Sequence, residues 1–236
     1  MSCSDPIAVP VVTVDGPSGS GKGTISRLLA SRLGWHFLDS GALYRALALK
    51  AQYAGVNADD EGRLAQLART LDLGFELRAG DAEPTVVLDG KRVGDELRTE
   101  AVGAMASAVA ALPAVRAGLV EMQRRFQQPP GLVADGRDMG TVIFPAAPVK
   151  VFLTATAQAR ALRRHKQLKE KGLTASLHGL LAEIEARDAR DASRATAPLK
   201  AAPDALVIDS TELSVEAVIA RIVPMVQRSF GLRGVI

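Results

Sequence analysis

The chain is poor in cysteine and has no long apolar run, and each shortage excludes a class of protein. Its 236 residues include a single cysteine, Cys3, so a disulfide framework and a cysteine-ligated metal site are both excluded. No apolar run approaches the roughly twenty residues of a membrane-spanning helix. A basic segment followed by an apolar stretch, which would indicate a secretory signal, is not evident. We therefore expect a cytoplasmic protein.

Net charge and histidine are also scarce. The formal net charge is only +3, which is too weak to indicate nucleic-acid binding. The histidines, His36, His165 and His178, show no metal-ligand spacing, and no paired catalytic serine and histidine motif is present. Hydrophobic residues make up 47% and charged residues 23% of the chain, as in an ordinary globular protein with one sizeable core.

Short apolar runs alternate with segments of helical periodicity. The expected strands are Val11–Val14, Trp35–Leu38, Leu132–Ala134, Val149–Leu153 and Ala205–Ile208. The expected helices are Ile25–Leu33, Ala42–Ala54, Arg98–Ala111, Val115–Gln127, Ala157–Lys171, Leu177–Ala192 and Val215–Ser229. Buried strands that alternate with helices predict an α/β fold with a parallel sheet covered on both faces. Ligands of such a fold gather at the carboxyl ends of the strands.

One region, within Val56–Leu97, breaks the alternation. Leu73–Leu77 and Thr85–Leu88 have the composition of strands, and Asp89-Gly90 is a hairpin-turn signal before Lys91 to Val93. The region therefore predicts a small antiparallel β insert.

A glycine-rich segment follows the first strand and precedes the first helix. It consists of Gly16, Pro17, Ser18, Gly19, Ser20, Gly21, Lys22, Gly23 and Thr24. Glycines let successive backbone N–H groups turn toward one anion, and the helix adds its N-terminal donors. A glycine- and serine-rich loop with a surface lysine is the alternative, which the flanking strand and helix disfavour. The segment predicts a phosphate-binding loop (P-loop) for a nucleoside triphosphate.

The residue after the lysine departs from the common P-loop pattern, which has Ser or Thr there. This chain has Gly23 and then Thr24. The order is similar to that of nucleoside monophosphate kinases. It leaves open whether Thr24 contacts Mg²⁺ directly, acts through water, or contacts a phosphate.

Charged residues cluster on the expected helix Leu177–Ala192 and just after it. Arg187, Arg190, Asp191 and Arg194 have the spacing of one helix face. A solvated face balanced by acidic neighbours is one interpretation. Beside a P-loop, a movable arginine clamp for a phosphate is the favoured one.

Polar residues follow two further strands. Asp135, Arg137 and Asp138 come directly after one of them, at the edge where ligands are expected. Ser40 and Arg45 follow another. A polar loop, a helix-capping serine and a surface arginine are the plainer alternatives.

Four motifs in order resemble the bacterial-type cytidylate kinase family, from about Val11 to Ser229. They are Gly-Pro-Ser-Gly-Ser-Gly-Lys-Gly-Thr at 16–24, Leu-Asp-Ser-Gly-Ala-Leu-Tyr-Arg at 38–45, Ala-Asp-Gly-Arg-Asp-Met-Gly-Thr-Val-Ile-Phe-Pro at 134–145 and Arg-Asp-Ala-Arg-Asp-Ala-Ser-Arg at 187–194. The resemblance implies transfer of the γ-phosphoryl group of ATP to CMP or dCMP, with Mg²⁺, in pyrimidine metabolism.

The resemblance also implies an organisation. It gives one P-loop kinase domain over residues 1–236, with a five-stranded parallel core at about 8–55, 98–157 and 195–236. A monophosphate-binding insert spans about 56–97, and a helical lid spans about 158–194. The small-molecule substrates imply no nucleic acid or membrane partner, and we expect a monomer.

Site residues carry over from the family position by position. Residues 16–24 and Arg163 would hold ATP, and Thr24 would be the metal contact. The CMP phosphate would be held by Ser40, Arg45, Arg137 and Arg194, the ribose by Arg187 and Asp191, and the cytosine by Ser107, Arg116 and Asp138. The catalytic residues would be Lys22, Asp135, Arg137, Arg187 and Arg194.

Two rival functions stay open at this point. A kinase for UMP, AMP or another small acceptor is disfavoured by the third motif. A nucleotide-dependent switch is disfavoured by the arginine-dense lid, because a switch does not need to clamp a second phosphate.

Overall fold

The computed structural model describes residues 9–76, 85–170, 172–194 and 196–232. These residues form two compact units. The first contains the described residues up to Leu38 and from Arg124 onward, and the second is Asp39–Gln123. Each unit has its own apolar core. The boundaries expected for core, insert and lid stay predictions.

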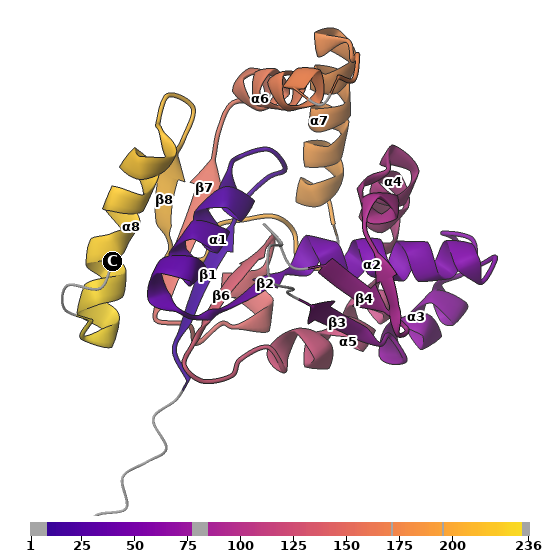
Figure 1. The fold of residues 1–236 in the computed structure, drawn as a ribbon, viewed down its shortest axis with the longest axis horizontal. Coiled ribbons are helices and arrows are strands. Elements are labelled where there is room, and N and C mark those ends of the chain that lie inside the picture. The colour runs from indigo at the N-terminus through magenta and orange to yellow at the C-terminus, as the bar shows by residue number, and fades with distance from the viewer. Residues whose placement is uncertain (1–8, 77–84, 171, 195, 233–236) are drawn as a thin grey trace, which may run out of the picture. The chain divides into compact units, whose positions relative to one another are not determined.

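A five-stranded sheet is the centre of the first unit (Figure 1). Its strands are β1 (Val11–Asp15), β2 (His36–Asp39), β6 (Leu132–Gly136), β7 (Val149–Thr154) and β8 (Leu206–Asp209), in the order β2-β6-β1-β7-β8. β1 pairs in parallel with β6 and β7, and β7 pairs in parallel with β8. Every residue of β1 and β6 is buried, which is why their apolar residues run continuously. The predicted parallel sheet is confirmed.

The helices of the first unit begin and end close to the expected positions. They are α1 (Lys22–Leu33), α6 (Ala157–Glu170), α7 (Leu177–Ala192) and α8 (Val215–Phe230). Gly34 ends α1 in a left-handed conformation, as C-terminal glycines do. Ser176 and Ser214 cap α7 and α8 by accepting a backbone N–H each.

The second unit combines helices with a small antiparallel sheet. Its helices are α2 (Ser40–Tyr53), α3 (Glu61–Arg69), α4 (Glu100–Val109) and α5 (Pro113–Arg124), the last running one residue beyond the unit. Its strands are β3 (Leu73–Glu76), β4 (Thr85–Leu88) and β5 (Lys91–Val93). β4 pairs antiparallel with both others. The expected insert is confirmed, although Leu77 of the expected first strand lies outside the described residues.

Three local elements were not expected from the sequence. The segment before the antiparallel strands contains α3, which Asp60 caps and whose Leu64, Ala65 and Ala68 are buried. A π-helical turn, Met139–Ile143, follows β6 (η2 in the element order). A 3₁₀ turn, Asp95–Arg98 (η1), also precedes α4, so the expected helix from Arg98 begins at Glu100 instead.

Among the described helices, none is by itself long and apolar enough to cross a membrane. The helices α4 and α5 reach the length and apolar composition of a membrane span only if they are counted together as one bent segment.

Candidate active site

The glycine-rich loop joins the end of β1 to α1. A Cβ at Gly16, where φ is +152°, would lie 2.0 Å from the backbone oxygen of Leu153, so only glycine fits beside β7. Gly21, in a left-handed conformation, precedes the first turn of α1. Ser20 is buried, and its Oγ has no hydrogen-bond partner within the described part of the chain. A tight loop, a helix N-terminus and an unsatisfied hydroxyl together fit an anionic ligand.

The P-loop lysine lies beside the carboxylate at the end of β6. Lys22 Nζ is 3.5 Å from Asp135 Oδ1, and both side chains are largely buried. A Cβ at Gly23 would lie 3.2 Å from Asp135 Oδ2. A side chain at this position would therefore crowd the carboxylate, which would have to move slightly to make room for it. Thr24 follows as an exposed residue in the first turn of α1.

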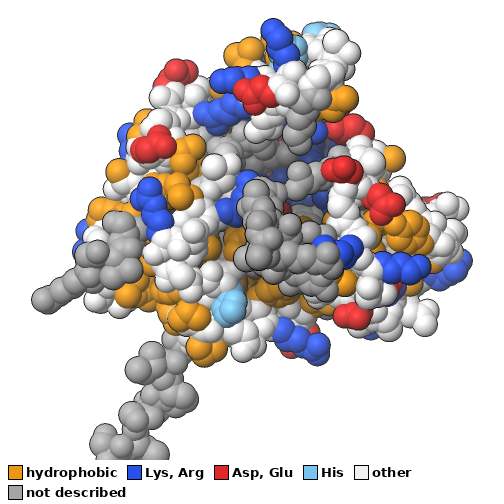
Figure 2. Space-filling view, in the orientation of Figure 1, with side chains coloured by type: hydrophobic (Ala, Val, Ile, Leu, Met, Phe, Trp, Pro, Cys, Tyr) orange, Lys and Arg blue, Asp and Glu red, His pale blue; other side chains and the backbone are white. Residues whose placement is uncertain are grey.

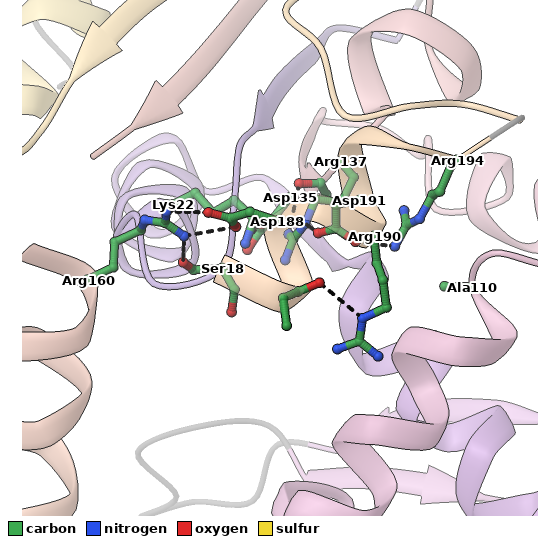
Figure 3. Close-up of polar contacts among 12 residues, drawn as sticks. Ser18, Lys22, Ala110, Asp135, Arg137, Arg160, Asp188, Arg190, Asp191 and Arg194 are labelled. Atoms are coloured by element: carbon green, nitrogen blue, oxygen red, sulfur yellow. Dashed lines mark hydrogen bonds and ion pairs between the residues drawn. The ribbon is translucent and has the colours of Figure 1, made fainter. Parts of the chain in front are cut away.

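A single buried carboxylate, Asp191, holds two arginines (Figure 3). It is 1% exposed. Arg137 Nε donates to its Oδ2 at 2.9 Å, and Arg194 Nη2 donates to its Oδ1. Burial by itself raises the pKa of Asp191, but Arg137 and Arg194, with a smaller contribution from Arg187, hold that pKa below its usual value. The carboxylate therefore stays ionised and keeps the guanidinium groups together.

The expected four-residue helix face is only partly correct. Because α7 ends at Ala192, Arg194 lies beyond the helix and reaches Asp191 from the following segment. Arg190 is exposed, and its Nε donates to the carbonyl oxygen of Ala186 one turn earlier in α7. The structure therefore groups Arg187 and Arg194 with Asp191, and not Arg190.

Arg163 of α6 lies against the P-loop and the segment after β8. Its Nη1 donates to the carbonyl oxygen of Ser20 at 3.4 Å, and its Nη2 donates to the carbonyl oxygens of Ser210 and Thr211. The side chain expected to cover ATP is therefore anchored at its tip beside the loop that would hold the phosphates.

Asp138 directly precedes the π-helical turn that follows β6, and it is buried. A second carboxylate, Asp15 at the end of β1, accepts the backbone N–H groups of Met139 and Gly140, both at 2.8 Å. Burial raises the pKa of Asp15 to about 7, although those backbone donors oppose the rise, and Asp138 and Asp135 add to it. Sequence reasoning missed this role. The one feature of the sequence that could have indicated this role is that Asp15 directly precedes the glycine-rich loop.

The second unit contains the other expected substrate residues. Ser40 is the first residue of α2 and is buried, and Asp39 is the capping residue, with Oδ1 accepting the N–H of Ala42 at 3.1 Å. The capping interpretation of Ser40 was therefore wrong. Arg45 is half-buried, and its Nη1 donates to the carbonyl oxygen of Leu97 at 2.8 Å, so the exposed-arginine interpretation was wrong as well.

Ser107 on α4 and Arg116 on α5 are also buried. Arg116 Nη1 donates to the carbonyl oxygen of Ala110 at 3.0 Å, and its guanidinium lies 6.0 Å from the ring centroid of Tyr44. The Oγ of Ser107 has no hydrogen-bond partner among the residues that the structure describes. A buried hydroxyl of this kind is costly unless a ligand satisfies it.

Comparison with known proteins gives one consistent result. The sequence profile of a family described as "Cytidylate kinase" matches residues 12–228. The chain belongs to the cytidylate kinase family. A cytidylate kinase of Azotobacter vinelandii is 59% identical over 213 residues, which cover 90% of this chain and 93% of that protein. One from Pseudomonas fluorescens is 59% identical over 217 residues, covering 92% and 94%.

A cytidylate kinase of Pseudomonas aeruginosa is 56% identical over 221 residues, which cover 94% of this chain and 96% of that protein. Members of this family are phosphotransferases, so the chain is an enzyme and not the nucleotide-dependent switch considered from the sequence. In this member of the cytidylate kinase family, the described residues contain no cluster of three or more His, Cys, Asp or Glu suited to a metal ion.

The raised pKa of Asp15 predicts a pH-dependent stability. Between pH 3.8 and about 7 the folded protein keeps this proton and the unfolded chain releases it. The stabilising effect of the group is thus fully present below pH 3.8 and is lost as the pH rises toward 7. Relative to an Asp15→Asn variant, the free energy of unfolding of the native protein should fall across this window, by up to about 1.4 kcal/mol per pH unit. Urea unfolding of both proteins at several pH values measures it.

The difference in the free energy of unfolding between the native protein and Asp15→Asn reports on Asp15 alone, because the two proteins share every other titrating group. A difference that is independent of pH would show that Asp15 titrates normally in the folded state. If the native protein instead gained stability relative to Asp15→Asn as the pH rises, the pKa of Asp15 would be lowered in the folded state. The two backbone donors would then outweigh burial.

Proposed function

We propose that this enzyme transfers the γ-phosphoryl group of ATP to CMP or dCMP, giving ADP and CDP or dCDP, as part of pyrimidine nucleotide metabolism. The observation that supports it most is the cationic cluster at the end of β6. There Asp135 contacts Lys22 of the P-loop, and Arg137, two residues later, shares Asp191 with Arg194. In this proposal one strand end would bring the cation for a nucleoside triphosphate and the cations for a second phosphate together.

Phosphoryl transfer between two nucleotides is a reaction that these cationic side chains would suit. Phosphoryl transfer depends on alignment and on charge neutralisation more than on covalent help from the protein. The acceptor is already an anionic phosphate oxygen, so no catalytic base is required. Two polyanions must instead be held together against their repulsion. Lys22 would neutralise charge on the transferred group, and Arg137 and Arg194 would hold the CMP phosphate with paired hydrogen bonds.

The remaining substrate contacts divide by chemistry. Ser40 and Arg45 would add to the phosphate ligands. Arg187 and Asp191 would contact the ribose, and Arg163 would cover ATP, as the family positions imply. The cytosine would be bound by Ser107, Arg116 and Asp138. The unsatisfied hydroxyl of Ser107 supports this assignment, since a base edge supplies the missing partner.

Asp138 offers the basis for discrimination between pyrimidines. Cytosine presents an N4 amino group, which a carboxylate accepts. Uracil presents an oxygen at that position, which would face the carboxylate without a proton between them. An unpaired buried polar group costs about 1–3 kcal/mol, which predicts a preference for CMP over UMP of roughly tenfold to a hundredfold.

Mg²⁺ fits the residues present, because this ion prefers octahedral oxygen ligands and usually keeps waters while binding substrate phosphates. Thr24 and Asp135 are the side chains that would hold it, directly or through water. When bound, the ion would neutralise charge on the ATP phosphates. The cytoplasmic location and the monomeric state stay predictions.

The direct test mixes the protein with ATP and Mg²⁺ and measures ADP, with CMP, dCMP, UMP, AMP or no acceptor. ADP should form with CMP and dCMP and only slowly in their absence, because the reaction needs an acceptor phosphate between the cations. ADP formation that does not depend on the acceptor would contradict the proposal, and faster formation with UMP or AMP would assign a different acceptor.

Replacement of Asp138 should change the acceptor preference more than the turnover. In Asp138→Ala the ratio of kcat/KM for CMP to that for UMP should fall by roughly tenfold or more, because the carboxylate that accepts the amino group is lost. Lys22→Ala and Arg194→Ala should instead lower kcat and leave that ratio nearly unchanged. Asp138→Asn keeps the side-chain volume, so it separates the recognition of the cytosine amino group from the packing of this side chain. A normal CMP to UMP ratio in both Asp138 variants would refute the recognition role.

A further inference from the structure

Arg160 is a buried cation to which sequence reasoning assigned no function. It lies near the start of α6 and is 3% exposed. Its Nε donates to the carbonyl oxygen of Ala155 at 3.0 Å, and its Nη1 donates to that of Ser18 at 3.1 Å. Both η nitrogens also donate to the two carboxylate oxygens of Asp188 on α7. One guanidinium therefore joins the P-loop to both lid helices (Figure 3).

The P-loop approaches Arg160 closely as well as accepting a hydrogen bond from it. The carbonyl of Ser18 belongs to the loop itself, and the next residue, Gly19, packs on the arginine side chain. A Cβ at Gly19 would lie 3.2 Å from Arg160 Cβ. The loop therefore passes close to the start of the Arg160 side chain, with little room for an added side chain between them.

The helix α7 makes the second connection. Asp188 and Asp191 are three residues apart on α7, so they project from adjacent positions on one side of the helix. Asp188 binds Arg160, whereas Asp191 binds Arg137 and Arg194. The helix is therefore attached at one point to Arg160, which contacts the P-loop, and less than one turn later to the arginines assigned to the CMP phosphate.

We propose that Arg160 and Asp188 form a positioning pair that couples the binding of ATP to the binding of CMP. ATP phosphates fix the conformation of the P-loop at Ser18 and Gly19, and Arg160 transmits that conformation to Asp188. The same helix then places Asp191, which orients Arg137 for the acceptor. By reciprocity, CMP should strengthen ATP binding by the factor with which ATP strengthens CMP binding. This inference rests on the proposed function.

Space-filling Figure 2 shows Lys and Arg side chains gathered over the α6 and α7 region. Arg160 differs from the exposed members of this group because its side chain is buried and paired through two hydrogen bonds with Asp188, which is partly exposed. Charge-assisted bidentate pairs are both stronger and geometrically stricter than single hydrogen bonds. Lysine cannot replace such a pair, because its ammonium is a point charge without the planar fork.

The test measures the affinity of a non-hydrolysable ATP analogue by calorimetry, with and without saturating CMP, and CMP affinity with and without the analogue. The native protein should show coupling of about fivefold or more in both directions. In Arg160→Lys and Asp188→Asn the coupling should fall below about twofold, while the affinity for each nucleotide alone changes less. A residue that only stabilises the fold would lower the melting temperature and leave the coupling intact.

A double-mutant comparison isolates the pair. Arg160→Ala combined with Asp188→Ala should lose no more coupling than either single change, because both remove the same connection. Asp204→Asn is the matched control, since it removes a different ion pair of the same unit, with Lys150 at 2.9 Å. Glu185→Gln changes an exposed charge on α7 itself. Both controls should retain the native coupling.

The outcomes separate the two proposals. If the native protein phosphorylates CMP and shows coupling that all of the Arg160 and Asp188 variants retain, the positioning pair is wrong and the proposed function stands. Native activity without any coupling would also overturn the pair. Failure of the native protein to bind or phosphorylate CMP would overturn the proposed function itself. Should the alanine variants fold poorly, Asp188→Asn alone decides, measured well below its melting temperature.

Discussion

Like charges in the candidate site are held together by carboxylates, of which Asp135 and Asp191 are buried, and the rest of the site depends on this. Lys22, Arg137, Arg194 and Arg160 would repel one another in a partly buried region without counter-charges. Asp135 lies beside Lys22, Asp191 binds Arg137 and Arg194, and Asp188 binds Arg160. Each carboxylate thus fixes its cations before any phosphate binds.

This arrangement suits an enzyme whose substrates are both polyanions. A cation that is already oriented stabilises charge in the transition state without further reorganisation. Burial of ion pairs is expensive, and removal of one partner leaves an uncompensated charge. The acidic and basic side chains of this site therefore depend on each other. A change at Asp191 should alter the positions of Arg137 and Arg194, because both arginines are bound to its carboxylate.

The sequence allowed prediction of the features that local chemistry determines. The parallel strands, the strand–loop–helix order around the glycine-rich segment and the Asp89-Gly90 turn depend on residues close together in the chain, and each was confirmed. The helix α3 was missed because a short amphipathic segment lay within a region of strand-like composition. Arg190 was grouped with the clamp because spacing alone does not show where a long side chain points.

The missed parts of the site are pairings between distant residues. Asp15 and Gly140 are 125 positions apart, and Arg160 and Asp188 are 28 apart. Nothing in the local sequence selects these partners among the many acids and bases of the chain. The fold determines them by placing β1 beside β6 and α6 beside α7. Burial then makes each pairing costly to lose.

The most direct test of the account is a crystal structure with a non-hydrolysable ATP analogue and CMP. The measured quantity is the distance from the guanidinium nitrogens of Arg137 and Arg194 to the oxygens of the CMP phosphate. The account predicts hydrogen-bond distances of about 2.7–2.9 Å, with Asp191 still bound to both arginines. Arginines that stay on Asp191 while the CMP phosphate lies beyond contact distance would contradict it.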